Sequence, residues 1–566
     1  MSRRPNQGPD IRASDHRGHS APRRRALAVR SSPAGELASD DSARNGRPRL
    51  GYSPTQVPGA ALSLAAHLLS RAPLGGHRRP RPVATARRER LEPLPWQRGC
   101  ERCLGLFAGR GPSGPFGPFV SVRGRVRPSV RRAKLSSPSL RGTTSVAGLT
   151  NWAGNHAYAA ARLHEPRSVE QLQEIARKAS FVRAVGSRHS FNDIADTTGD
   201  LVSLHRMPRR FELDEAAGTV TVDGGVSYGV IGAPLDAAGY ALNSLASLPH
   251  ISVAGSCATA THGSGDRVAN LSTAVSAMEV VTADGEITIF ERDRDPDLFD
   301  GVVVSVGALG IVTSLTLDLQ PTFRMRQDVY RDLPLEMVAA RLDEITASAD
   351  SVSLFTEWRH PAFEQVWLKR RVPDGSSFEP PHEFFGATIA TVPMHPIRGM
   401  SAAACTPQLG VAGPWHERLP HFKMDHTPSS GAELQSEYLV PRRHAVDALL
   451  AIHAVRNRFA ARLQVCEVRT IAADPLWMST AFGRDSVAFH FTWLPDWDGL
   501  RGVLPIIEAA LAPFEPRPHW GKLFTMSPAA VQTRYEKLPA FTALIERVDP
   551  SGKFRNAFVN RYVFGE

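Results

Sequence analysis

One short turn constrains this chain more than any other segment. Residues 186–190 read Gly-Ser-Arg-His-Ser and directly follow a strand-like apolar run at 181–185. Small residues at a strand end predict a tight turn whose backbone amides can face an anion, with one imidazole presented beside it. A second small-residue loop lies at 252–256, and a third at 261–265. Together the loops predict a cradle for a phosphorylated cofactor, with a histidine near enough to take part in chemistry.

Positive charge is concentrated in the first quarter of the chain. Residues 1–145 contain 28 Lys and Arg against 8 Asp and Glu, which gives a net charge of +20. Because the whole chain has a formal net charge of +11, residues 146–566 have a net charge of −9. The first segment is rich in Arg, Pro, Gly and Ser and has no apolar periodicity, which predicts disorder. It can be read as a basic arm, a targeting segment or sequence upstream of the true start. This segment has a single Lys and no Met after Met1, and both facts favour the third reading.

The cysteines and the apolar runs exclude several classes. Five cysteines in 566 residues argue against a disulfide scaffold. Cys100 and Cys103 form a lone CxxC with no second pair for zinc, and no metal is expected. Cys257, Cys405 and Cys466 are expected to be small buried residues. No apolar run approaches the roughly 20 residues that span a bilayer. We therefore expect a cytoplasmic protein that binds neither membrane nor nucleic acid.

The remainder of the chain reads as α+β. Order is expected from about Asn151, and Ser168 and Gln171 form a capping box before a helical pattern. Strand patterns follow at 201–204, 219–222 and 311–317, with a hairpin at 280–289 around Asp-Gly. No GxGxxG lies between a strand and a helix, which disfavours a Rossmann domain. Residues 146–320 are predicted to form one α+β unit, and residues 321–515 a second domain with a sheet and flanking helices.

Three late segments place polar groups within apolar strand patterns. The period of two puts Glu467 and Arg469 on one strand face, and likewise His490 and Thr492. The segment 519–522, His-Trp-Gly-Lys, ends in Lys522 beside bulky residues, where its pKa can fall. Taken singly, each segment also has a purely structural explanation. Glu467 and Arg469 could form an ion pair, His490 and Thr492 could hydrogen-bond to each other in the core, and Lys522 could lie on the surface. Together they suit a polyhydroxylated ligand.

Residues 151–566 resemble the vanillyl-alcohol-oxidase-type flavoproteins, and within them the bacterial alditol oxidases that act on xylitol and sorbitol. The segments that carry the resemblance are 151–155, 186–192, 246–256, 431–438 and 519–522. The resemblance implies a two-domain fold with an FAD-binding domain at 146–320 and a substrate (cap) domain at 321–515. Residues 516–566 would complete the flavin site, and the disordered basic extension 1–145 has no counterpart.

The resemblance also implies FAD attached covalently through His189. The other implied cofactor contacts are Ala184, Val185, Gly186, Ser187, Arg188, Ser190, Ser247, Ser252, Gly255, Thr259, Ala260, Thr261, His262, Gly310, Val312 and His519. In two of these positions, Arg188 and Ala260, the chain departs from the family, which has glycine there. Neither departure removes a reacting group, although either could alter flavin attachment.

The implied reaction is oxidation of a terminal primary alcohol, with dioxygen reduced to hydrogen peroxide. The implied substrate contacts are Ser247, Glu467, Arg469, His490, Thr492 and Lys522. Arg469 and Lys522 would stabilise developing alkoxide charge, and Glu467 would orient a neighbouring hydroxyl and keep Arg469 in place. The proton acceptor stays open, and a lysine of lowered pKa is one candidate.

Two alternatives remain at this point. An aldonolactone oxidase or dehydrogenase on the same fold would also use acidic and basic groups here. A protein of a different class would use residues 1–145 to bind nucleic acid or membrane, with an affinity that falls steeply with salt. Deleting those residues would abolish the function of such a protein, whereas we expect it to leave oxidation unchanged.

Overall fold

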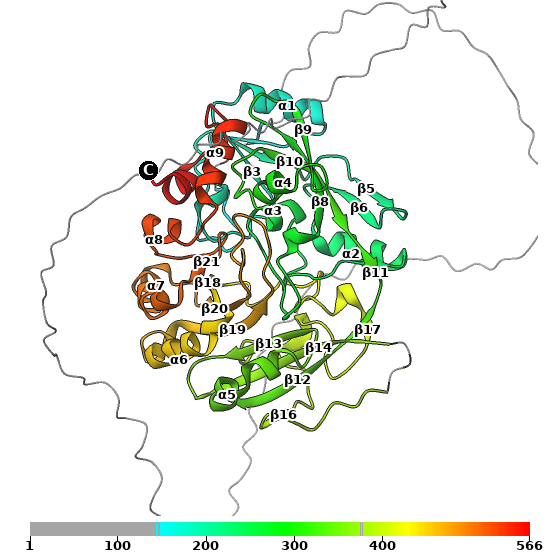
Figure 1. Ribbon diagram of the computed structural model, residues 1–566, viewed down its shortest axis with the longest axis vertical. Helices are drawn as coiled ribbons and strands as arrows, with labels where there is room; N and C mark the ends of the chain where they lie inside the picture. The colour runs from blue at the N-terminus through cyan, green and yellow to red at the C-terminus, as the bar shows by residue number, and fades with distance from the viewer. Residues whose placement is uncertain (1–142, 145, 147, 374, 376) are drawn as a thin grey trace, which may run out of the picture. The chain divides into compact units, whose positions relative to one another are not determined.

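The computed structural model describes residues 143–566, apart from 145, 147, 374 and 376 (Figure 1). The predicted extension therefore lies almost wholly outside the described residues, and so do Cys100 and Cys103. Its last part, Thr143–Thr144, forms strand β1, so regular structure begins earlier than the predicted Asn151. Within the described part of the chain, no helix is long and apolar enough to cross a bilayer.

A small mixed sheet leads into the turn at 186–190. Its strands, in the order β1-β2-β4-β3, are β1, β2 (Arg162–His164), β4 (Asp200–Ser203) and β3 (Val182–Val185). Helix α1 (Val169–Lys178) begins after Ser168, whose side chain accepts a bond from the Gln171 N–H at 3.4 Å. The Gln171 side chain accepts from the Arg167 N–H instead of returning to Ser168, so the predicted capping box is half formed.

A five-stranded antiparallel sheet follows. Its strands, in the order β5-β6-β10-β8-β9, are β5 (Phe211–Asp214), β6 (Thr219–Asp223), β10 (Ile311–Asp318), β8 (Val275–Val281) and β9 (Ile287–Glu291). The predicted hairpin joins β8 to β9, and Gly285 in its turn has φ +78°. The associated elements are α2 (Tyr228–Ala237), α3 (Val253–Ala258), α4 (Pro296–Val302) and the pair β7 (Tyr240–Ala241) and β11 (Gln320–Pro321).

The largest sheet has ten antiparallel strands. They are β12 (Arg324–Pro334), β13 (Ser351–Thr356), β14 (Ala362–Val372), β15 (Glu383–Phe384), β16 (Ala387–Ile389), β17 (Gly413–Pro414), β18 (Leu434–Pro441), β19 (Leu463–Ile471), β20 (Ser486–Trp493) and β21 (Arg517–Pro518). Three helices bury their apolar sides against one face: α5 (Leu335–Thr346), α6 (Ala445–Val455) and α7 (Trp497–Leu511). The other face of its central strands is free to carry polar groups.

The end of the chain returns to the first part of the fold. Helices α8 (Pro528–Gln532), α9 (Leu538–Val548) and α10 (Ala557–Val559) share a hydrophobic core with α2, α3 and α4. Trp520, in the segment before them, is buried in the same core. The α+β class is confirmed, while the boundaries 146–320, 321–515 and 516–566 stay a prediction. Cys257, Cys405 and Cys466 are buried and free, as expected.

Candidate active site

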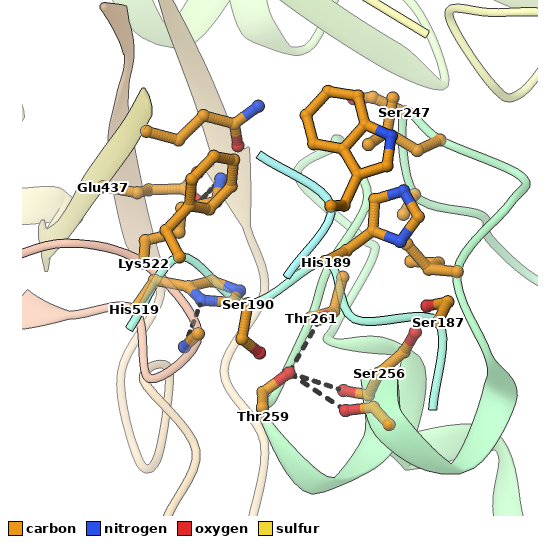
Figure 2. A pocket seen from close by; sticks show the side chains of 18 of the residues that line it. Ser187, His189, Ser190, Ser247, Ser256, Thr259, Thr261, Glu437, His519 and Lys522 are labelled. Carbon is orange, nitrogen blue, oxygen red and sulfur yellow. Dashed lines mark hydrogen bonds and ion pairs between the residues drawn. The ribbon is translucent and has the colours of Figure 1, made fainter. Parts of the chain in front are cut away.

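Strand β3 ends in a cradle of small residues at one end of a large cavity. Gly186 and Gly255 both crowd Ser252: a Cβ added at either glycine would lie 2.2 Å or 2.7 Å from the Ser252 hydroxyl. The Ser252 N–H donates to the Ser187 hydroxyl at 3.1 Å, which joins the two loops. Figure 2 shows Ser187, Ser256, Thr259 and Thr261 gathered on the His189 side of the cavity. This wall brings backbone and hydroxyl groups close to a ligand without bulk.

His189 is the imidazole of this cradle. Its ring stacks on Trp152, with centroids 5.2 Å apart, and both ring nitrogens are buried without a hydrogen-bond partner in the described chain. Burial lowers the pKa of His189 to about 4; repulsion from His250 adds to the shift, and the Ser187 backbone opposes it. A neutral imidazole has one unprotonated nitrogen, and here no described side chain occupies either nitrogen, which suits the ring to forming a bond to a ligand.

The segment 151–155 holds this turn from outside. The Trp152 N–H donates to the Arg188 carbonyl at 2.8 Å, and the Asn151 amide donates to the Ser190 carbonyl at 2.9 Å. The Asn155 amide donates to the Phe191 carbonyl at 2.8 Å. These bonds explain why the early Asn-Trp motif accompanies the turn.

Both departures from the family pattern fall at left-handed backbone positions. Arg188 has φ +62° and Ala260 has φ +52°. Glycine adopts this conformation freely, whereas a Cβ makes it unfavourable by roughly 1–2 kcal/mol. The exposed Arg188 side chain donates to the Thr150 carbonyl at 3.0 Å, which partly compensates. The glycines that the resemblance implies at these positions would meet the backbone requirement without strain, whereas this chain meets it with strain.

The opposite end of the cavity is a floor of buried polar side chains on the free face of the ten-stranded sheet. Glu467 and Arg469 on β19 share this face, as predicted, with Arg469 Nε 3.6 Å from Glu467 Oε2. His490 on β20 lies opposite Glu467 in register, and its Nδ1 is 3.5 Å from Glu467 Oε2. His490 Nε2 is buried without a hydrogen-bond partner among the described residues. Thr492 also lines the cavity.

Glu437 on β18 is the centre of the floor, and sequence reasoning assigned it no role. One carboxylate oxygen accepts from Arg469 Nη2 at 2.7 Å, and the other accepts from Lys522 Nζ at 2.6 Å (Figure 2). His262 Nε2 lies 3.3 Å from the first oxygen. Burial alone would raise the pKa of Glu437, but Lys522 and Arg469 outweigh it and hold that pKa well below its usual value.

The segment that carries Lys522 is held by hydrogen bonds to the two residues that follow the turn, and the His519 N–H donates to the Glu437 carbonyl at 3.0 Å. The Phe191 N–H donates to the Gly521 carbonyl at 2.8 Å. The Asn192 amide donates to the carbonyls of Trp520 and Lys522, both at 2.8 Å. Burial lowers the pKa of Lys522, as expected, and Glu437 opposes that shift. The cradle therefore fixes the position of the late lysine.

Most of the predicted site residues line this one cavity. Those that do are Ala184, Val185, Gly186, Ser187, Arg188, His189, Ser190, Ser247, Ser252, Gly255, Thr259, Thr261, His262, Glu467, Arg469, His490, Thr492, His519 and Lys522. Ala260, Gly310 and Val312 lie outside its lining, and a Cβ at Gly310 would meet Val280 and Val281. Their cofactor role stays a prediction.

Among the lining residues that the sequence reasoning did not assign, Glu437 and His421 were missed for different reasons. Glu437 is signalled by the alternation of Glu433, Gln435 and Glu437 beside an apolar strand pattern, which places three polar groups on one face. His421, whose Nε2 lies 2.8 Å from Glu467 Oε1, sits outside any regular element and leaves no such signal.

The residues present fit FAD on two observations. The glycines around Ser252 leave a cradle that a single Cβ would fill, which suits close contact with a diphosphate. The buried, unpaired nitrogens of His189 face the same cavity as Lys522 and Glu437, so that attachment and chemistry can share one site.

Comparisons with known proteins agree with this arrangement. Residues 160–291 match the family described as FAD binding domain, and residues 429–562 match that described as D-arabinono-1,4-lactone oxidase. The chain is 49% identical over 421 residues to alditol oxidase from a Streptomyces species, covering 74% of this chain and 99% of that one. It is 30% identical to L-gulono-1,4-lactone dehydrogenase from Mycobacterium tuberculosis, covering 73% and 98%.

A solved structure extends the likeness to the fold. Cholesterol oxidase from Brevibacterium sterolicum superposes with a TM-score of 0.60 at 14% identity, covering 76% of this chain and all of that one. At this identity the match speaks for the fold alone, and it agrees with the two-part FAD-binding architecture expected from the sequence.

Proposed function

Because the chain belongs to the alditol oxidase family of FAD-binding oxidoreductases, we infer that it is an FAD-dependent enzyme that oxidises the terminal primary alcohol of alditols such as xylitol and sorbitol to the aldose. The observation that carries this proposal is a single cavity with a small-residue cradle and His189 at one end. At its other end, Arg469 and Lys522 share the carboxylate of Glu437.

FAD bound in the cradle would supply the hydride acceptor and return the electrons to dioxygen, giving hydrogen peroxide. We assign its covalent attachment to His189, because burial keeps this imidazole neutral and its nitrogens have no competing partner in the described chain. Gly186, Ser252 and Gly255 would meet the diphosphate through backbone and hydroxyl groups.

Arg469 and Lys522 would bind the reacting hydroxyl and stabilise negative charge on its oxygen as the proton leaves. Both are cations held by Glu437, so their positions are set before substrate arrives, which is the requirement for electrostatic stabilisation. Lys522 donates to Glu437 here, which favours this role over that of proton acceptor.

The remaining hydroxyls would be held by groups around this pair. Ser247 accepts from Arg469 Nη1 at 3.4 Å, and Glu467 lies beside both Arg469 and His490. Thr492 follows His490 on the same strand face. A row of alternating donors and acceptors of this kind suits an open-chain polyol.

The test is oxidation of xylitol or sorbitol with peroxide release, measured against an aldonolactone with a dye acceptor. The lactone reaction is the second candidate, because the family match at 429–562 and the mycobacterial relative carry lactone names. Activity on the lactone alone would overturn the alditol assignment.

The attachment of FAD is tested separately. Acid precipitation should leave yellow colour in the protein pellet of the wild type, and His189→Ala should release the flavin to the supernatant. Colour retained by His189→Ala would refute the assignment. We also propose a cytoplasmic location, supported by the three free cysteines, which cell fractionation would check.

A further inference from the structure

A buried lysine–histidine pair lies behind Glu467, and none of the roles above uses it. Lys369 on β14 is 1% exposed, and its Nζ donates to the carbonyls of Leu419 and Pro420 at 2.6 Å and 2.9 Å. Its third bond goes to His421 Nδ1 at 3.1 Å. His421 Nε2 in turn lies 2.8 Å from Glu467 Oε1. The three side chains form one continuous row that ends at the cavity.

With Lys369 charged, the row admits one arrangement of protons. A lysine ammonium only donates, so His421 Nδ1 must accept from Lys369. A neutral imidazole then carries its proton on Nε2, where it donates to Glu467. Burial lowers the pKa of His421 to about 4, and the nearby Lys369 adds to that shift, so the ring is neutral. Burial also lowers the pKa of Lys369 to about 7. The ammonium supplies all three bonds below that pH, whereas above it the two remaining N–H groups go to the carbonyls of Leu419 and Pro420 and His421 Nδ1 loses its donor.

The protein holds the His421 ring firmly. Trp367 and Phe355 contact it edge-on, with ring centroids 5.1 Å and 5.7 Å away. The backbone N–H of His421 donates to the Ser247 carbonyl at 3.0 Å. His421 therefore supports two of the predicted substrate contacts: its backbone holds Ser247, and its side chain holds Glu467.

Glu467 meets charged or titratable groups on its other side as well. Its second oxygen faces Arg469 Nε at 3.6 Å and His490 Nδ1 at 3.5 Å. His421 is the shortest of these contacts, and it approaches the oxygen that Arg469 and His490 leave free. Removing it would let the carboxylate turn toward the two cavity-side groups.

We propose that Lys369 and His421 are positioning residues for alditol binding: Lys369 holds His421 in the Nε2–H tautomer, and His421 holds Glu467 in the orientation that meets the substrate hydroxyls. The proposal rests on the proposed function, since it names how that site recognises its polyol. Neither residue needs to touch the reacting atoms.

A matched pair of His421 variants tests the proposal. His421→Gln places an amide N–H near the original Nε2 and can still donate to Glu467, whereas His421→Asn is too short to do so. We expect KM for xylitol to stay within about 3-fold of wild type in His421→Gln and to rise roughly 10- to 100-fold in His421→Asn, the range for a lost bond to a charged group. The value of kcat should change less than KM in both variants, at equal flavin content. Equal KM values for the pair would overturn the proposal.

Lys369→Met removes the donor at similar length and should raise KM in the same way as His421→Asn. Should this variant not fold, the His421 pair still decides. Nitrogen-15 NMR of histidine-labelled holoenzyme, assigned with His421→Gln, should show a bare Nδ1 and a protonated Nε2 at His421. A proton on His421 Nδ1 would overturn the proposed roles of Lys369 and His421, whichever substrate the enzyme oxidises. A wild type that oxidises no alditol overturns the proposed function, and the NMR result then decides the row by itself.

Discussion

The two ends of the cavity are lined by different kinds of residue. The cradle around Ser252 consists of glycines, hydroxyls and one neutral imidazole, and it is shaped by contacts so close that an added Cβ would force the Ser252 hydroxyl to move. The floor around Glu437 consists of buried charges, in which one carboxylate serves two cations. The cradle should therefore fail when volume is added, and the floor when charge is removed.

The largest effect is expected from Glu437→Gln in the floor. Lys522 would lose its ion-pair partner, and Arg469 would keep only Glu467, 3.6 Å away. Removing one partner of a buried ion pair typically lowers the free energy of unfolding by about 3–5 kcal/mol. Urea denaturation should show this loss, together with a fall in peroxide release. Glu433→Gln is the matched control, because buried Glu433 accepts its bonds from neutral Ser430 and Gln435. Equal losses in the two variants would contradict the charge argument.

Acid should weaken both ends through their imidazoles. The pKa values of His189 and His421 are lowered to about 4, from 6.5 in an unfolded chain. As pH falls from about 6.5 to 4, the unfolded chain takes up protons before the folded one, so stability declines across this window. His421→Gln should flatten the decline by up to about 3 kcal/mol. Replacing the exposed His205 in the same way provides the control, and an equal flattening there would refute the assignment.

Adding one methyl group should damage the cradle. In Gly186→Ala the new Cβ would lie 2.2 Å from the Ser252 hydroxyl, and overpacking of this kind lowers stability by about 1–3 kcal/mol. The flavin-to-protein absorbance ratio and the melting temperature should both fall. Adding Ser252→Ala to the same chain should restore part of the loss, because the clashing oxygen is gone. A double variant no better than Gly186→Ala would show that the damage arises elsewhere.

The smallest effect is expected where the cradle is already strained. Arg188→Gly should raise stability by up to about 1 kcal/mol, since the position has positive φ and an exposed side chain. The lost bond to the Thr150 carbonyl offsets part of this gain. Ala260→Gly should gain less, because it relieves the same strain but removes a fully buried methyl group. Ala509→Gly, on the exposed side of helix α7, should instead lose roughly 1 kcal/mol. Thermal unfolding distinguishes these signs, and destabilisation by Arg188→Gly as large as that by Ala509→Gly would count against the strain argument.

Sequence reasoning predicted the parts of the site that depend on local order. The turn at 186–190 is set by a strand and the small residues after it. The shared face of Glu467 and Arg469 follows from the period of two. Residues 519–522 were recognised as a unit, but their partners in the turn, Phe191 and Asn192, were not. That contact spans more than three hundred residues, and no local pattern encodes it.

By itself, the sequence of this protein determined its family, its α+β class and a set of site residues most of which line the cavity, because these depend on motifs and on strand periodicity. The tertiary structure alone decided how the buried charges are shared. Glu437, Arg469 and Lys522 come from β18, β19 and the segment after β21, and only the strand order β19-β20-β18-β21 brings one carboxylate between two cations. The same holds for Lys369 and His421 behind Glu467, since a buried polar group finds its partner through packing in space.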